Sequence, residues 1–262
     1  MNWWQGAVLG VVQGLTEFLP ISSSGHLVVA QAAVGLSIPG VLVEVTLHVA
    51  TLLAVLIVYW TRLGELVAGA IRGDRTAWGY VGLLVLGTIP AGAIGLLFAD
   101  WFERAFDSLL MVGVSFLVTA GILWSTRRIQ IVMVKQTPSW TGAFSIGLAQ
   151  ALAVMPGISR SGSTIAAGLW LGLDPVRAAE YSFLLAVPAI LGAAILQLPH
   201  LSGDLGSVGI GPLAVGFVCA LVSGVLAIRA LVGLLRKGGF HRFAPYCFLL
   251  GIVVIVWGTV VA

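Results

Sequence analysis

Long apolar runs alternate with short polar segments along this chain of 262 residues. A helix needs about 20 consecutive apolar residues to cross the hydrocarbon core of a bilayer. Six runs come close to that length, and we predict one membrane-spanning helix for each of them: 42–60, 77–99, 107–125, 177–197, 211–234 and 243–261. The pattern is therefore typical of an all-α polytopic membrane protein.

Another apolar segment near the start of the chain is interrupted before it can span. Residues 2–19 are long enough, but Pro20 ends the helix and Ser22–Gly25 continue it poorly. A short apolar piece, 26–36, follows. Broken backbone survives at membrane depth only where protein or a water-filled cavity covers it. We therefore predict a re-entrant helix–loop–helix hairpin that enters and leaves on one side.

A second broken segment repeats the plan of the first. It holds an apolar piece over 140–154, a break at 155–157 and another piece over 161–172. When the segments are laid over each other without gaps, identical residues coincide: Gln13 with Gln150, Leu15 with Leu152, Ile21 with Ile158, Ser22 with Ser159, Ser24 with Ser161, and Gly25 with Gly162. The differences are chemical, since Val154, Arg160 and Ser163 replace Glu17, Ser23 and His26.

The repetition predicts two halves, repeat 1 over about 1–130 and repeat 2 over about 138–262. Each half then holds one re-entrant hairpin and three spans. Because three is odd, the second half begins on the opposite face of the membrane, which makes this an inverted repeat. We expect the two hairpins to enter from opposite sides and to touch tip to tip near the midplane, where inverted repeats place their binding sites. The whole chain is one integral membrane domain.

Composition and charge agree with a membrane protein and exclude other classes. The chain is 59% hydrophobic and 9% charged, whereas soluble domains carry roughly 25% charged residues. The net charge of +3 does not indicate nucleic-acid binding, since no basic run has aromatic residues interleaved. Two cysteines, Cys219 and Cys247, lie inside apolar runs without the spacing of a disulfide framework or a zinc site.

The basic residues also predict the orientation. The predicted topology places one arginine, Arg104, on the side of the N-terminus and ten basic residues on the other side: Arg62, Arg72, Arg75, Arg127, Arg128, Lys135, Arg177, Arg236, Lys237 and Arg242. Cytoplasmic segments are enriched in lysine and arginine. We therefore expect the loops 61–76, 126–139 and 235–242 inside, and both termini and the mouth of the first hairpin outside.

The strongest candidates for chemistry are two charged residues in the hairpins. A carboxylate such as Glu17 is costly in a membrane and indicates function, although a structural cap or an arginine partner is the alternative. Arg160 begins a helix among Ser159, Ser161, Ser163 and Thr164, and the alternative is a snorkelling arginine. Helix amides, hydroxyls and a guanidinium together suit a phosphate group.

The histidines are weaker candidates. His26 begins a helix after three serines and a glycine, where a capping or packing role is the alternative. His48 follows Glu44 by one helical turn, which places both on one face as an interior pair. His200 and His241 lie in predicted loops, and we expect no role for them.

These residues resemble a known family. The stretch Gln13–Pro20 with Ser22–His26, and the stretch Pro156–Thr164, are similar to the two motifs of undecaprenyl-diphosphate phosphatases, the bacitracin-resistance protein family. The resemblance covers essentially the whole chain. It implies an enzyme of the plasma membrane that hydrolyses undecaprenyl diphosphate to undecaprenyl phosphate and phosphate. Such an enzyme recycles the lipid carrier of cell-wall (peptidoglycan) synthesis and gives resistance to the antibiotic bacitracin.

The resemblance also implies the site. Glu17, His26 and Arg160 take the essential positions, assisted by Ser23. The phosphate-binding candidates are the polar and glycine residues around them: Gln13, Thr16, Ser22, Ser24, Gly25, Ser159, Ser161, Gly162 and Thr164. A divalent cation, Mg or Ca, is expected as cofactor, with Glu17 as its candidate ligand. Many members carry glutamate where this chain has Gln13, which removes one ligand charge. A second copy of the chain is a candidate partner.

The residues alone leave the nucleophile open between His26, Ser23 and water. Glu17 is the only carboxylate in either motif and could activate any of them. The main rival function is a secondary transporter or translocase of a polyprenyl phosphate or another anion, since inverted repeats and broken helices are transporter features. A third hypothesis, a structural or interaction protein, leaves Glu17 and Arg160 in the membrane without a purpose.

Overall fold

A computed structural model describes residues 1–33, 42–129, 134–197 and 209–261. Within these ranges the regular elements are helices, apart from one isolated bridge between Lys135 and Leu173. The predicted all-α polytopic class is therefore confirmed. His200 and residues 130–133 of the predicted loop 126–139 lie outside the described residues.

All six predicted spans are helices, with ends shifted by a few residues. They are α3 (Leu42–Val58), α5 (Arg75–Leu97), α7 (Leu109–Ser125), α10 (Pro175–Gln197), α12 (Ile210–Leu235) and α13 (Ala244–Val261). Five of the described helices are long and apolar enough to cross a membrane, counting the turns that extend α7 and α13. The sixth is α3 taken together with α4, from which it is separated by a bend of 77°.

The expected loop over 61–76 is wrong, because most of it forms the helix α4 (Trp60–Ile71). The chain bends at Tyr59 and then forms a helix again, because no proline or pair of glycines follows. The helix ends just before Gly73, whose φ is +74°. Leu66 and Gly69 face the protein, while Trp60 and Ile71 are exposed. At the other end of the molecule a second short helix, α6 (Ala99–Phe106), links α5 to α7.

Both re-entrant hairpins form where they were predicted. The first consists of α1 (Trp3–Phe18) and α2 (Ser23–Ala33), and residues 34–36 of its second limb lie outside the described residues. The second consists of α8 (Trp140–Leu152) and α9 (Arg160–Trp170). Side chains cap the outer starts of both hairpins: Asn2 accepts from the amide of Gln5, and Ser139 from that of Gly142.

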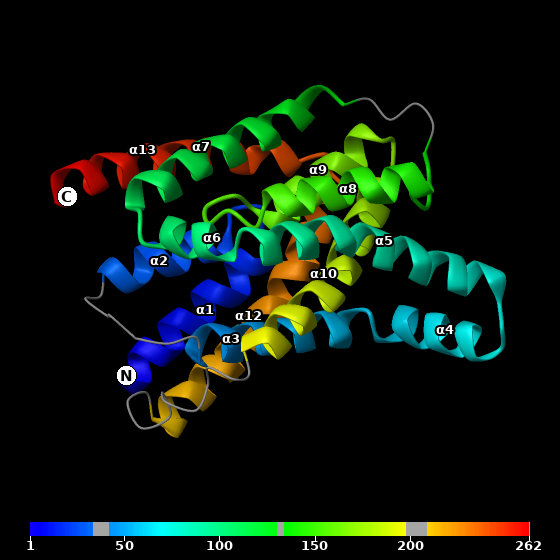
Figure 1. Cartoon of the computed structure of the whole chain (residues 1–262), viewed down its shortest axis with the longest axis horizontal. Coiled ribbons are helices and arrows are strands. Elements are labelled where there is room, and N and C mark those ends of the chain that lie inside the picture. Colours follow the sequence, from blue (N-terminus) through cyan, green and yellow to red (C-terminus); the bar gives the residue numbers. More distant parts are fainter. Residues whose placement is uncertain (34–41, 130–133, 198–208, 262) are drawn as a thin grey trace.

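Each hairpin packs on a span of the other half of the chain. The helix α1 lies along α12, and α8 lies along α5 (Figure 1). Glycines allow the backbones to meet: a Cβ on Gly10 would lie 2.2 Å from the Gly216 carbonyl oxygen, and one on Gly147 would lie 2.5 Å from that of Gly87. The two halves thus interleave, with the same small-residue crossing built twice.

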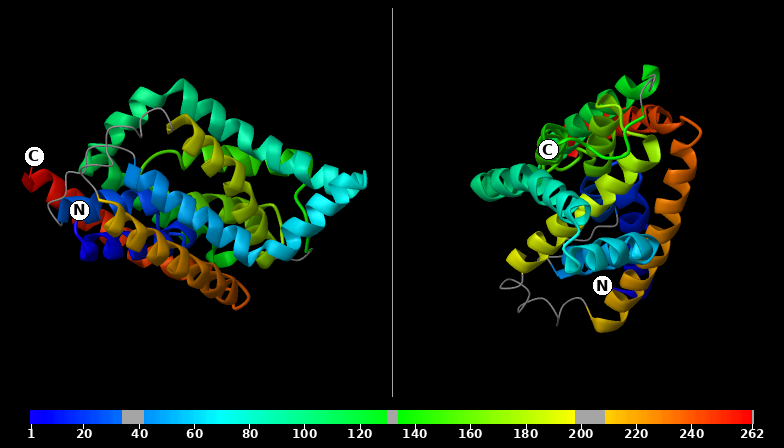
Figure 2. Two further views of the ribbon diagram at one scale, coloured as in Figure 1. Left: turned by 90° about the horizontal axis from the view of Figure 1, so that it is seen from below. Right: turned by 90° about the vertical axis from the view of Figure 1, so that its right-hand side faces the viewer.

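The long helices give the molecule two distinct ends. Both termini lie at one end and α4 lies at the other (Figures 1 and 2). The helices α7 and α13 pack against each other as a pair beside the hairpins. The breaks of both hairpins come together in the interior, between these ends, and they form the site described next.

Candidate active site

The first break is shaped by a proline and a strained serine. Leu19 is extended at φ −64° and ψ 145°, as expected for a residue before proline, and it ends α1. Ser22 has φ +69°, the left-handed region that a residue with a Cβ rarely occupies. The Ser22 backbone carbonyl accepts from the His26 ring Nδ1 at 2.7 Å. The turn therefore reverses the chain sharply and starts α2 at Ser23.

The second break is held by a hydroxyl from α7. Gly157 has φ +93°, and a Cβ there would lie 2.5 Å from the Val112 carbonyl oxygen. The buried Thr119 hydroxyl donates to the Gly157 carbonyl at 2.9 Å and accepts from the Ser159 amide at 3.0 Å. Ser159 in turn caps α9 through the amide of Gly162. These contacts fix the point at which α9 begins with Arg160.

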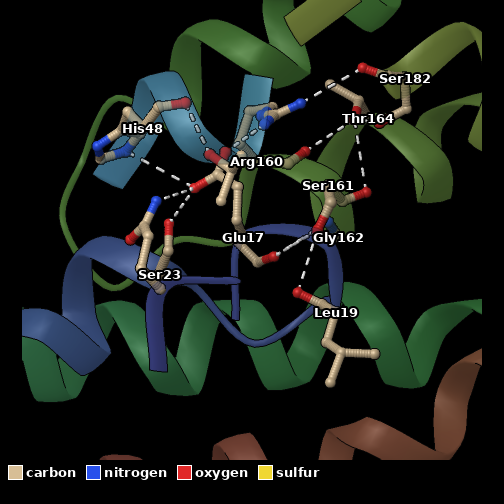
Figure 3. A network of polar contacts seen from close by, with 12 residues as sticks. Glu17, Leu19, Ser23, His48, Arg160, Ser161, Gly162, Thr164 and Ser182 are labelled. Atoms are coloured by element: carbon tan, nitrogen blue, oxygen red, sulfur yellow. Dashed lines mark hydrogen bonds and ion pairs between the residues drawn. The ribbon is translucent and has the colours of Figure 1, made fainter. Parts of the chain in front are cut away.

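The two tips interlock in the interior, as the inverted repeat predicts. The Ser161 hydroxyl donates to the Leu19 carbonyl at 3.2 Å, across the two breaks (Figure 3). A Cβ on Gly25 would lie 2.9 Å from the Gly157 Cα, so the tips are in close backbone contact there. Because both glycines lie where the tips meet, any larger side chain would separate them.

Glu17 lies at the centre of the polar contacts (Figure 3). One carboxylate oxygen, Oε1, accepts from the Arg160 guanidinium of the other hairpin. The other, Oε2, accepts from the Ser23 hydroxyl at 2.6 Å and from the Gln13 amide at 3.1 Å. The carboxylate is nearly buried, with 6% of its side chain exposed. Arg160, Ser23 and Gln13 all contact it as donors, which compensates the carboxylate for its burial.

His48 approaches Glu17 from a third element. Its Nε2 lies 3.6 Å from Oε2 of Glu17, and its Nδ1 lies 2.8 Å from the Glu44 carbonyl one turn earlier on α3. Since a carbonyl only accepts, Nδ1 carries a proton and Nε2 faces the carboxylate. The predicted shared face of Glu44 and His48 is confirmed, and that face borders the candidate site.

A cavity of about 330 Å³ opens beside these groups. Its polar side combines both hairpin breaks with α3 and carries Thr16, Glu17, Ser22, Ser23, Ser24, Glu44, His48, Ser159 and Arg160. The apolar side comes from α10, the second break, α3 and α6: Val45, Phe106, Ala153, Val154, Ile158, Ala189, Ile190, Ala193 and Ala194. One cavity thus offers both a charged wall and a hydrocarbon wall.

Several sequence-predicted residues support this wall from behind. Gln13 donates to Glu17. Ser161 links the two hairpin tips, and the amide of Gly162 donates to the cap residue Ser159. Thr164 shares a hydrogen bond of 2.6 Å with the Ser182 hydroxyl of α10. Gly25 lies at the tip contact. These five residues do not line the cavity.

His26 is not brought to Glu17. Its Nε2 lies 2.7 Å from the Tyr246 hydroxyl of α13, and its ring stacks on the Tyr246 ring at 5.7 Å between centroids. Its other nitrogen is bonded to the Ser22 carbonyl. With both nitrogens engaged and the ring outside the cavity lining, this geometry favours Ser23 over His26 as the nucleophile.

The groups around Glu17 offer a poor ligand set for the expected divalent cation. Among the residues that the structure describes, no three His, Cys, Asp or Glu side chains gather into a metal site. Both oxygens of Glu17 already accept from donors, including the positively charged Arg160. Gln13 supplies an amide where a second carboxylate could have bound a cation. These residues do not fit a resident divalent cation.

Two residues that contact the candidate site residues were not predicted from the sequence. The first is His48, whose contact with Glu17 joins residues of α3 and α1 and has no local signal beyond the Glu44–His48 spacing. The second is Tyr246, which lies 220 positions from His26 and looks like an ordinary apolar-run tyrosine. Long-range pairs of this kind become visible only when the helices are assembled.

The arrangement has the parts of a nucleophilic hydrolase of anionic esters or anhydrides. A serine hydroxyl donates to a carboxylate that could accept its proton. An arginine and the starts of two helices, α2 and α9, face the same cavity. Helix starts and guanidinium groups stabilise negative charge.

Comparison with known proteins points to one family. The family model for the bacitracin resistance protein BacA matches residues 6–253. An undecaprenyl-diphosphatase of Desulfosudis oleivorans is 44% identical over 94% of this chain and 95% of its own length. Another, from Desulfatibacillum aliphaticivorans, is 40% identical over 98% and 99%, and one from Methanosphaera stadtmanae is 38% identical over 97% of each chain.

Proposed function

The chain belongs to the bacitracin resistance protein BacA family, and we propose that it hydrolyses undecaprenyl diphosphate to undecaprenyl phosphate and phosphate with Ser23 as the nucleophile. It is a multi-pass membrane phosphatase, and the resemblance stated from the motifs is confirmed. This activity recycles the lipid carrier of cell-wall synthesis, the basis of bacitracin resistance.

One observation carries the catalytic part of the proposal. The Ser23 hydroxyl donates at 2.6 Å to Glu17, and the same carboxylate is paired with Arg160 of the other hairpin. A serine is a weak nucleophile until a base accepts its proton, and Glu17 is the carboxylate in place to do so. The Glu17–Arg160 pair exists only because the two tips meet, which explains why both motifs are needed.

Arg160 and the helix starts would bind the diphosphate. A guanidinium has five N–H donors, and Arg160 uses one nitrogen toward Glu17 and another toward the Ser182 carbonyl at 3.4 Å. Donors remain for the terminal phosphoryl group. The helices α2 and α9 both begin at the cavity, so the positive ends of two helix dipoles face the same anion.

The reaction then follows from these positions. The Ser23 oxygen attacks the terminal phosphorus while its proton passes to Glu17 Oε2, and the bond to the bridging oxygen breaks with release of undecaprenyl phosphate. Water next attacks the phosphoserine, the bond to Ser23 breaks, and the serine recovers a proton through Glu17. Arg160 stabilises the charge on the phosphoryl oxygens in both steps, an effect typically worth about 10²–10³ in rate.

The apolar wall suits the beginning of the polyprenyl chain. On α10, Ala189 and Ala193 lie one turn apart and leave room beside the polar wall, while Phe106 covers the edge. Ala193 is exposed, so this wall continues to the outer surface of the helix bundle. A lipid can therefore enter sideways, with its tail among the helices and its headgroup at Arg160.

For location and cofactor we propose the following. The enzyme lies in the plasma membrane with both termini and the cavity mouth outside, because ten of the thirteen basic residues were predicted on the opposite side. If Mg or Ca takes part, the diphosphate of the substrate would have to hold it, since the residues around Glu17 do not fit a cation of their own.

The direct test uses purified protein in lipid nanodiscs with undecaprenyl diphosphate. We expect phosphate release by the wild type, its loss in Ser23→Ala, and a phosphorylated Ser23 after rapid acid quench. A folded wild type that releases no phosphate contradicts the activity. Release without any label on Ser23 moves the attack to water, and label on His26 restores the histidine mechanism. The rival transporter function predicts no phosphate release and is not favoured by the relatives.

A further inference from the structure

The contact between Tyr246 and His26 has no function in the proposed reaction as derived so far. The Tyr246 hydroxyl lies 2.7 Å from His26 Nε2, and the two rings are nearly parallel at 9°. The ring of Phe116 from α7 meets the His26 ring edge-on, with the ring centroids 5.2 Å apart. The imidazole is therefore held by side chains of both α7 and α13.

The orientation of the imidazole determines what its other nitrogen does. The Ser22 carbonyl can only accept, so His26 Nδ1 carries the proton and donates to it at 2.7 Å. In the neutral ring Nε2 is then an acceptor, and the Tyr246 hydroxyl is the donor that it needs. Tyr246 thus selects the tautomer and ring position that bind the Ser22 carbonyl.

That carbonyl belongs to the strained residue directly before the nucleophile. Ser22 has φ +69°, a conformation that persists only when neighbouring groups hold it. A second contact from α13 reaches the same break, since the Cys247 thiol lies 3.7 Å from the Pro20 carbonyl. The break that directs Ser23 toward Glu17 is therefore held from the start of α13.

We propose that Tyr246 is a positioning residue for the reaction: acting through His26, it holds the Ser22 turn so that the Ser23 hydroxyl stays at Glu17. This inference rests on the proposed function, and it assigns His26 a supporting role. It predicts an effect on turnover rather than on substrate affinity, because neither ring lines the cavity.

The test compares two tyrosine-to-phenylalanine variants that each lose one short hydrogen bond. Tyr246→Phe should lower kcat about five- to tenfold with KM within about twofold of wild type, as expected for one lost neutral hydrogen bond that acts on catalysis. The matched control is Tyr181→Phe, since the Tyr181 hydroxyl donates at 2.6 Å to the Leu83 carbonyl in the helix core. It should lower the unfolding temperature and leave kcat unchanged.

A double-mutant cycle shows whether Tyr246 acts through His26. In a His26→Ala background, Tyr246→Phe should have no further effect on kcat. Multiplying effects in the double variant, or a Tyr246→Phe enzyme with wild-type kcat, overturns the inference. An inactive wild type would instead contradict the proposed function, so the two failures are distinguishable.

Discussion

Glu17 shows how a single charged residue can be tolerated in an apolar protein. Its carboxylate accepts from Arg160, Ser23 and Gln13, so the cost of burial is offset by an opposite charge and two hydrogen bonds. Glu44 also lines the cavity, but the carboxylate to which the Ser23 hydroxyl donates is that of Glu17. The contacts that offset the burial of Glu17 are therefore the same ones that place it in the candidate site.

Removing that charge should abolish most of the activity. Glu17→Gln keeps the size but cannot accept a proton from Ser23, and we expect kcat to fall at least 10²-fold, in the range for lost general bases. The exposed pair of Glu65 with Arg62 offers a control, since Glu65→Gln removes a surface ion pair worth about 0–1 kcal/mol. Phosphate release and the unfolding temperature of both variants check this. A Glu17→Gln enzyme with more than a tenth of wild-type kcat would count against the base.

Arg160 should not be replaceable by lysine. Its guanidinium reaches Glu17 and the Ser182 carbonyl with different nitrogens and still has donors for phosphate. Lysine keeps the charge but lacks the planar fork, so Arg160→Lys should lose about 10²-fold or more in kcat/KM. Steady-state kinetics at matched expression are the measurement. Near-normal turnover would mean that Arg160 acts as a point charge.

The left-handed Ser22 makes a separate prediction about stability. Glycine tolerates φ +69° without the Cβ penalty, whereas alanine keeps that penalty and loses the same hydroxyl. Ser22→Gly should therefore be more stable than Ser22→Ala by about 1 kcal/mol, measured as a higher unfolding temperature. Equal unfolding temperatures would show that the turn carries no strain.

For single residues, the sequence shows where burying a charge is costly, but not which way a side chain points. Glu17 and Arg160 could be singled out because a charge in an apolar segment is expensive wherever it points. The direction of His26 could not be predicted, since it depends on a tyrosine 220 positions away. His48 also escaped, because its approach to Glu17 depends on how α3 packs against α1.

Among the elements, the hairpins were predictable because their breaks are local. Pro20 and Gly157 disrupt the helix within their own segments, so the sequence places the breaks without knowledge of the fold. The helix α4 was missed because its signal is amphipathic rather than apolar, and a search for long apolar runs passes over it. The bend before it, at Tyr59, could not be predicted, because no proline or glycine lies there.

The glycine crossings of the hairpins should be intolerant of any side chain. A Cβ on Gly147 would lie 2.5 Å from the Gly87 carbonyl oxygen, so Gly147→Ala must push α8 away from α5. We expect a loss of about 1–3 kcal/mol, the range for an overpacked core. The control is Gly92→Ala on α5, where a Cβ would meet nothing within 4 Å. Unfolding temperatures in one detergent compare the two, and equal values would contradict close packing.

For the whole molecule, the interleaving of the halves explains why one chain needs both motifs. Each hairpin lies on a span of the other half, so Glu17 and Arg160 meet only in the assembled fold. The repetition of the motifs made the two matching hairpins and the meeting of their tips predictable. The apolar cavity wall on α10 was not predictable, because small side chains such as Ala193 carry no distinctive pattern.

The orientation of the molecule can be tested with single cysteines at its two ends. Ten of the thirteen basic residues were predicted on the side away from the N-terminus, where α4 lies, and we expect that end in the cytoplasm. In a background without Cys219 and Cys247, Asp107→Cys and Lys237→Cys place thiols at exposed positions of opposite ends. A membrane-impermeant maleimide should label position 107 in right-side-out vesicles and position 237 only in inside-out vesicles. The reverse pattern would place the cavity mouth in the cytoplasm, where it could not receive a diphosphate carrier released on the outer face.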